Sequence, residues 1–439
     1  MQRRHLLCLA LTTALVALPA ASQKAKNPPT NLYIDVLTHN MAGMPDMGGM
    51  MGGLGGFMAR RMGGADGGGK PTYPTARAGG LTGQYLDIAL HNSLKPGVEA
   101  TDQIPAGLNL GKSLTLIPVE PSKPGESSTP TGKIPDVQFK ITEYWGCGAA
   151  VRAGQPKVAT FTLKGGNKSI DPNNPMGSMQ GVDFSSTGSL SKNIPVQDRD
   201  IDLKPGWVYW PNRKYGKQVP SGARLAGQHA ISGDGIPASM QFQVQPEADF
   251  MPKLALRTQG ELSDAIGLSW PTVTRSRGYH ITGMHMQILG ENSYAMTIWS
   301  SAEVPGAGQD LHTNLTAGQL DKWLKQKVLL PASATSCTIP KGIFAGTSNV
   351  KGEQAAMPGM LSMSAYGPES WITYPPKPAD PKQPWNPEWS VRLRARSSAT
   401  AILGLDFGGM QQMEDGEQQQ DQPKKKPGMK GLLKGILGG

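Results

Sequence analysis

The stretch NLYIDVLTHN, residues 31–40, places apolar Ile34 and Val36 on alternate positions, which is the period of a half-buried β-strand. The stretch GQYLDIALHN, residues 83–92, aligns with it without a gap. The two share four residue types at matching positions: Tyr33 with Tyr85, Asp35 with Asp87, His39 with His91, and Asn40 with Asn92. This repeat predicts related β units in the N-terminal half of the chain.

Strand patterns continue on either side of the repeat. A second echo links IPAGLNLG at 104–111 with VPSGARLA at 219–226. The 56 glycines, 37 prolines and 17% charged residues favour many turns and short strands over long helices. We therefore predict a mainly β fold, with two or more sandwich-like units joined by long loops. Further strands are expected at 137–145, 157–165, 206–212 and 239–245.

The C-terminal half carries longer strand patterns at LSWPTVTRSRGYHITGMHM (268–286), SYAMTIWSSAEV (293–304), GMLSMSAYG (359–367) and EWSVRLRARSS (388–398). Together they resemble a fibronectin type III sandwich, with Trp270 as its core tryptophan and Tyr279 as its C-strand tyrosine. The resemblance implies buried side chains at Leu361, Met363, Ala365, Trp389, Val391, Leu393 and Ala395. A helix-like stretch, TAGQLDKWLKQKVLL at 316–330, interrupts the sandwich.

Such modules are mainly spacers or binding platforms, so the resemblance implies no activity. The whole chain also resembles uncharacterised exported bacterial proteins. Arg392, Arg394 and Arg396 alternate with the expected buried residues and should form an exposed basic row. Such a row would either meet an anionic envelope polymer or be a solvated face that discourages edge pairing.

The first residues have the layout of a secretory signal, residues 1–22, with Arg3 and Arg4 before an apolar run at 6–18. That run is shorter than the roughly 20 residues that span a bilayer. The protein is therefore expected to be exported, to the periplasm or the exterior. We divide the rest into an N-terminal β region (23–250) with a Met/Gly-rich loop (41–80), a fibronectin-like sandwich (251–405) and a flexible tail (406–439).

Two cysteines, Cys147 and Cys337, remain after removal of the signal. In an oxidising compartment they are expected to form one disulfide, which would close a 190-residue loop and contribute roughly 5 kcal/mol in the chain-entropy model. The alternative is two separate buried thiols. Removal of Arg3 and Arg4 lowers the formal net charge from +10 to +8. Without a basic stripe interleaved with aromatics, a nucleic-acid partner has little support.

The Met/Gly-rich segment raises a metal hypothesis. Met41, Met44, Met47 and Met50 recur every third residue, directly after His39. Thioethers suit Cu(I), and glycine lets a short loop wrap around one ion. If the two repeat strands pair as a hairpin, Asp35, His39, Asp87 and His91 would lie on one face at the root of this loop. The alternatives are a flexible linker and a partner-binding segment.

The tail ends in MKGLLKGILGG, residues 429–439. On a helix its apolar residues form one arc, which would dock on an anionic membrane or in a partner's groove. The alternative is a disordered end without a role.

Neither a GxSxG stretch before a helix nor an HExxH motif occurs, so no catalytic residue is nominated. The leading interpretation is a non-enzymatic envelope or extracellular protein that binds an envelope component or polymer, or has a structural role. A Cu(I)-handling protein comes second, and an enzyme with a site assembled from distant loops comes third.

Overall fold

The computed structural model describes residues 27–43, 71–78, 82–120, 136–164, 184–194, 201, 203–308, 311, 313–350, 353–380 and 382–404. In these residues the protein is mainly β, as predicted. The expected signal, most of the Met/Gly-rich loop and the tail lie outside the described residues. Among the residues that are described, no helix is long and apolar enough to cross a membrane.

The strands and helices follow one another in an order that keeps most of the expected elements. The strands are β1 (Thr30–Met41), β2 (Gly83–Asn92), β3 (Ala100–Gln103), β4 (Ser113–Pro118), β5 (Val137–Trp145), β6 (Lys157–Leu163), β7 (Phe184–Gly188), β8 (Trp207–Trp210), β9 (Gly227–Gly233), β10 (Gln241–Val244), β11 (Arg257–Gln259), β12 (Ile266–Ser269), β13 (Gly278–Gly290), β14 (Ser293–Ser300), β15 (Leu330–Pro331), β16 (Ser336–Ile339), β17 (Thr347–Val350), β18 (Glu353–Ala356), β19 (Gly359–Tyr374) and β20 (Trp389–Leu403). The α-helices are α2 (Thr75–Ala78) and α3 (Ala317–Lys325), and short 3-10 turns lie at Ala106–Leu108 and Pro246–Ala248.

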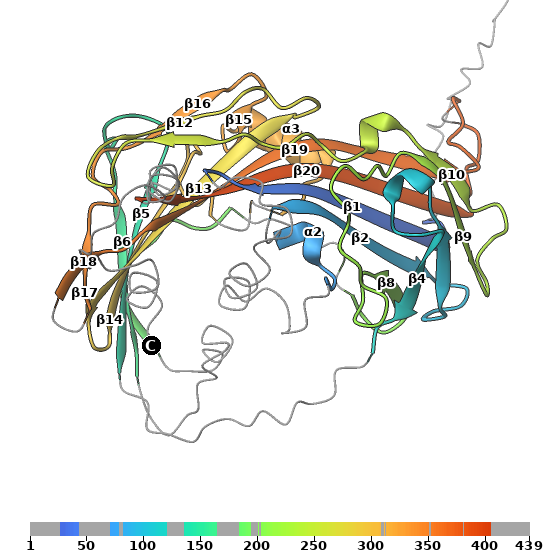
Figure 1. Cartoon of the computed structure of the whole chain (residues 1–439), viewed down its shortest axis with the longest axis horizontal. Helices are drawn as coiled ribbons and strands as arrows, with labels where there is room; N and C mark the ends of the chain where they lie inside the picture. The colour runs from blue at the N-terminus through green and yellow to red at the C-terminus, as the bar shows by residue number, and fades with distance from the viewer. Residues whose placement is uncertain are drawn as a thin grey trace, which may run out of the picture.

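Within the described residues, one large sheet has the strand order β10-β9-β3-β4-β8-β2-β1-β20-β19-β13-β14-β5-β6-β7, and β15 pairs with β13 (Figure 1). A smaller sheet has the order β11-β12-β16, and β17 pairs with β18. The two echo segments at 104–111 and 219–226 touch, because the Arg224 backbone N–H donates to the Gly107 carbonyl.

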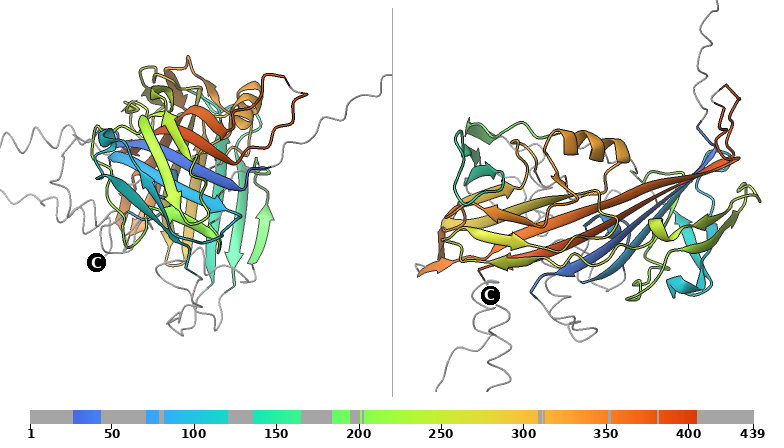
Figure 2. Two further views of the ribbon diagram at one scale, coloured as in Figure 1. Left: turned by 90° about the vertical axis from the view of Figure 1, so that its right-hand side faces the viewer. Right: turned by 90° about the horizontal axis from the view of Figure 1, so that it is seen from above.

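The centre of the large sheet joins the two halves of the sequence. β1 pairs antiparallel with β2 and parallel with β20, from Thr30 opposite Trp389 to Met41 opposite Thr400. β20 pairs antiparallel with β19, and Figure 2 shows these long strands side by side across the molecule. The sheet is therefore continuous across the expected boundary at residue 250, and the division into domains stays a prediction.

The central strands have two different faces. The core face carries aliphatic side chains, and it buries Leu361, Met363, Ala365, Trp389, Val391, Leu393 and Ala395, as expected. The other side, which we call the α2 face, holds Tyr33, Asp35, Asp87 and the three arginines of β20, and α2 packs on it against β1 and β2.

One end of the large sheet folds back onto the centre. Phe242 of β10 lies 6.2 Å from Trp389 of β20, measured between ring centroids. Buried side chains of β3, β4, β9 and β10 join those of β1, β2 and β20 in one hydrophobic cluster. The strands β10, β9, β3 and β4 thus form a second layer over the core face, and their opposite face points away from the core.

At the other end, Trp270 and Tyr279 are buried and contact each other edge to face, with ring centroids 5.6 Å apart. The arrangement of a fibronectin sandwich stays a prediction. The expected helix is confirmed as α3, which begins with a capping box between Thr316 and Gln319. The expected disulfide is also confirmed: Cys147, just after β5, is bonded to Cys337 in β16.

Candidate binding site

The two repeat strands pair as a hairpin, with Asp35 directly opposite Asp87. Because the strands are antiparallel, His39 lies opposite Gly83 and His91 lies opposite Asn31. All four predicted side chains share the α2 face, but the two histidines stand about 26 Å apart along the hairpin at roughly 3.3 Å per residue. Only His39 lies at the loop end of the hairpin.

Met41 ends β1, two residues after His39, whereas Met44, Met47 and Met50 lie outside the described residues. Across the described parts of the chain, no group of three or more His, Cys, Asp or Glu side chains is placed to hold a metal ion. Copper binding by the methionines stays a prediction.

Asp35 forms a buried ion pair with Arg394 of β20. The Arg394 guanidinium donates from Nε to Oδ1 and from Nη2 to Oδ2 of Asp35, at 2.8 Å each. Burial alone would raise the pKa of Asp35, but the charge and hydrogen bonds of Arg394 outweigh it and lower the pKa. Asp35 is therefore ionised at neutral pH.

Asp87 caps the helix α2. Its Oδ1 accepts hydrogen bonds from the backbone N–H and the hydroxyl of Thr75, both at 3.0 Å, and its Oδ2 accepts from the backbone N–H of Ala76 at 2.8 Å. Burial, together with the negative charge of Asp35, raises the pKa of Asp87 to about 7. The two opposed carboxylates thus titrate far apart.

Arg396 holds the other end of the same helix. Its Nη2 donates to the carbonyl oxygens of Ala76 and Arg77, and its Nη1 donates to the Ser364 hydroxyl at 2.9 Å. Burial lowers the pKa of Arg396 to about 10. A carboxylate at the N-terminus of α2 and a guanidinium at its C-terminal carbonyls match the helix dipole.

The expectation of an exposed basic row was wrong. Arg392, Arg394 and Arg396 are each at most 4% exposed. The strand alternation was right, but β1 covers the flank of β20, and Asp35 and α2 supply the negative partners that make burial of the arginines tolerable. Because Asp35 and Asp87 are each 2% exposed, this network is a structural core that holds α2 and is closed to solutes.

A solvent-facing surface of different character lies on the folded-back layer. Strand register places the outward side chains of β10, β9, β3 and β4 on one face, which we call the amide–hydroxyl face: Gln241, Gln243, Gln228, Ala230, Ser232, Thr101, Gln103, Ser113 and Thr115. The glutamines are exposed, while the alternate residues of the same strands are buried. None of these outward side chains carries an ionisable group.

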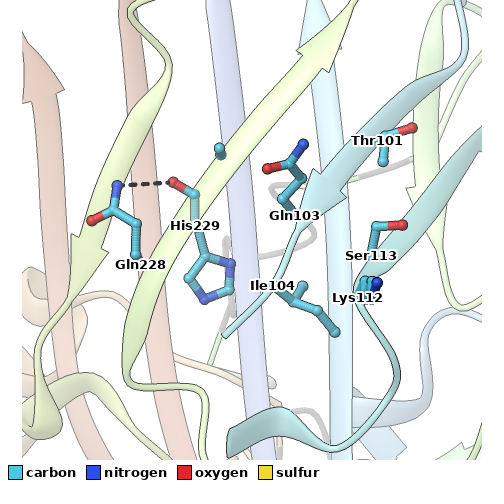
Figure 3. Close-up of a pocket in the computed structure, with 8 residues that line it drawn as sticks. Thr101, Gln103, Ile104, Lys112, Ser113, Gln228 and His229 are labelled. Atoms are coloured by element: carbon cyan, nitrogen blue, oxygen red, sulfur yellow. Dashed lines mark hydrogen bonds between the residues drawn. The ribbon is translucent and has the colours of Figure 1, made fainter. Parts of the chain in front are cut away.

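A pocket of about 450 Å³ opens on this face (Figure 3). It is lined by Thr101, Gln103, Ile104, Lys112, Ser113, Gln228, His229 and Ala230. Gln103 lies opposite both Ser113 and Ala230, so three paired strands fix the backbone around the pocket. Buried Ile104 adds an apolar contact, and exposed Lys112 places one positive charge at its border.

The imidazole of His229 lies on the opposite, buried side of these strands. Its Nδ1 lies 3.1 Å from Oδ2 of Asp102, its Nε2 lies 3.1 Å from the Leu225 carbonyl oxygen, and Phe242 stacks on its ring. Burial alone would lower the pKa of His229, but the hydrogen bond and charge of Asp102 raise it. Because both nitrogens face acceptors and both side chains are fully buried, the pair is an internal ion pair that braces β3 against β9 beneath the pocket.

No known protein-family model matches this chain, and no curated protein sequence matches it. Functional assignment therefore rests on the residues themselves. The amide–hydroxyl face was not predicted from the sequence, although QFQV at 241–244 displays the alternation that produces it.

Proposed function

We propose that this is a non-enzymatic envelope or extracellular protein that binds carbohydrate on the amide–hydroxyl face. The observation that carries the proposal is the chemistry of that face, whose exposed glutamines, serines and threonines offer neutral hydrogen-bonding groups only. A primary amide both donates and accepts hydrogen bonds, and so does a hydroxyl. Sugar hydroxyls present the same mixed pattern, so each can be paired without desolvating a charge.

Two further features support this ligand class. Ordinary protein surfaces carry charged residues at about a quarter to a third of positions, so a face without any is a departure that suits an uncharged, polar ligand. The pocket volume of about 450 Å³ falls in the usual range for small-molecule sites, roughly 300–1,000 Å³, and can seat a sugar unit.

The strand backbone favours binding because it is already ordered. Gln103, Gln228 and Gln241 project from hydrogen-bonded strands whose opposite sides are anchored in the core. Binding therefore orders side chains without ordering the main chain, which limits the entropy lost. The predicted signal at 1–22 and the disulfide are compatible with a role outside the cytoplasm.

The direct test is isothermal titration calorimetry of the full chain with four neutral hexasaccharides: cellohexaose, maltohexaose, xylohexaose and mannohexaose. At least one of them should bind. The double variant Gln103→Ala/Gln228→Ala should lower that affinity about tenfold or more, because two hydrogen-bonding side chains are lost.

The matched control is Gln259→Ala, which removes an exposed strand glutamine from β11 in the smaller sheet and should leave affinity unchanged. Absence of binding to all four sugars would reject the function. Binding that the double variant does not weaken would reject the site.

A further inference from the structure

A row of aromatic and basic side chains crosses the α2 face near one end of the central strands. The Arg392 guanidinium lies over the Tyr33 ring at 4.7 Å and over the Trp371 ring at 6.0 Å. Trp207 continues the row, with its ring centroid 5.7 Å from that of Tyr33 and 5.1 Å from that of His91. We call these five residues the aromatic–arginine row.

The row is reachable from solvent at its rings and positive beneath them. Trp371 is 55% exposed, and Tyr33, Trp207 and His91 are half-buried. Arg392 is 4% exposed and lies between two rings. A guanidinium held in a low-dielectric setting against aromatic faces projects its positive potential toward a ligand that stacks on those faces.

The charges around Arg392 do not cancel this potential. On the same face, Asp35 is bound by Arg394, and Asp87 is bound by the N-terminus of α2. A third carboxylate, that of Glu369, accepts a hydrogen bond from the backbone N–H of Ala317 at the start of α3. These three carboxylates face the guanidinium groups of Arg77, Arg392, Arg394 and Arg396, which leaves one positive charge in excess when all are ionised.

The row is also continuous with the amide–hydroxyl face. Ile117 of β4 lies opposite Tyr209 of β8, and Tyr209 lies opposite Ala89 of β2, so side chains on the α2 face follow those of Ser113 and Thr115 around the bend. The path from β10 to β19 crosses eight strand-to-strand steps in the sheet order. At about 4.8 Å per step its contour is about 38 Å, several times the width of a sugar ring.

We propose that the aromatic–arginine row is a second subsite for the same ligand, and that it binds acidic sugar units. This inference rests on the proposed function. The uncharged units of a polysaccharide would lie on the amide–hydroxyl face, and its carboxylated units would stack on Trp371 and Tyr33 above Arg392. The ligand class is therefore an acidic polysaccharide.

The test compares two polymers with the same backbone, polygalacturonate and its fully methyl-esterified form, by calorimetry. The native protein should bind the charged polymer about tenfold more tightly at low salt, and this preference should shrink as ionic strength rises. Trp371→Ala should weaken binding of both polymers about tenfold, because a stacking platform is lost. Arg392→Met keeps the length of the side chain and should abolish only the preference for the charged form.

The matched control is Tyr374→Ala, which removes a half-exposed ring from the opposite face of the same strand and should change neither affinity. Equal binding of the two polymers by the native protein, or unchanged binding by Trp371→Ala, would overturn the inference. Gln103→Ala/Gln228→Ala separates it from the proposed function. If that double variant weakens both polymers while Trp371→Ala does not, the function stands and the second subsite fails. The converse result keeps the row and rejects the amide–hydroxyl face.

Discussion

Asp87 and Asp35 lie directly opposite each other on paired strands, and like charges in such positions repel. Two neighbours resolve the conflict by treating the carboxylates differently. Arg394 keeps Asp35 ionised, while burial and the charge of Asp35 leave Asp87 with a pKa of about 7. At neutral pH the charge of Asp87 is therefore finely balanced, although its hydrogen bonds to α2 persist in both forms.

This balance gives the first prediction. The pKa of Asp87 is 3.8 in the unfolded reference and about 7 in the folded protein, so the folded state retains the proton as pH rises from about 4 to 7. The contribution of Asp87 to folding is full below pH 4 and is lost as pH rises through 7, by up to about 4 kcal/mol. Urea unfolding of wild type and Asp87→Asn from pH 4 to 8 should show this, with the difference in unfolding free energy falling over that window and constant above it. The idea fails if the difference does not vary with pH.

The second prediction concerns the ion pair itself. Arg394→Ala leaves the Asp35 carboxylate buried without its cation, so the variant should lose about 3–5 kcal/mol of unfolding free energy at pH 7. The double variant Asp35→Ala/Arg394→Ala should lose less than the sum of the two single variants, because neither charge is then stranded. Lys95→Ala is the control, since Lys95 and Asp234 form an exposed pair whose loss should cost at most about 1 kcal/mol. Additive losses in the cycle would contradict the coupling.

At the scale of elements, the disulfide joins the end of β5 in the large sheet to β16 in the smaller sheet. The third prediction is that reduction of the native disulfide lowers the unfolding free energy by about 5 kcal/mol, because a cross-link across 190 residues removes much freedom from the unfolded chain. Denaturant unfolding with and without reductant measures it. Cys147→Ala/Cys337→Ala should show no response to reductant, and an equal midpoint for oxidised and reduced wild type would refute the prediction.

Periodicity predicted elements well and their neighbours poorly. Ile34, Val36, Val391 and Leu393 were placed on buried faces because alternation is local information. Whether the opposite face is covered is not local, and for Arg394 it depends on a carboxylate 359 residues away. The same reason separates His39 from His91, because the aligned repeat does not reveal the direction of pairing.

The amide–hydroxyl face shows the same limit. The alternation at Gln241, Phe242, Gln243 and Val244 is visible in the sequence. However, β10, β9, β3 and β4 come from two distant segments, and only their pairing turns scattered glutamines into one surface. A site made by the sheet order is invisible to motif searches, which read consecutive residues.

At the scale of the whole molecule, the central pairing of β1 with β20 implies that the N-terminal half is not independent. The fourth prediction is that a fragment of residues 27–250 does not fold cooperatively, because β1 loses the strand that pairs along its full length. Circular dichroism and urea unfolding of the fragment, beside the full chain, test this. A sigmoidal transition in the fragment alone would instead support an independent domain that ends near residue 250.

The pairing of β1 with β20 also sets a waiting time. The partners Asp35 and Arg394 are 359 residues apart, so at roughly 5–20 residues per second a ribosome needs about 20–70 seconds to deliver the second strand after the first. During that interval β1 has aliphatic side chains and no partner on its β20 side. A nascent chain of this kind needs either a holding chaperone or passage through a translocon in an extended form, and its central strands are among the last to be completed.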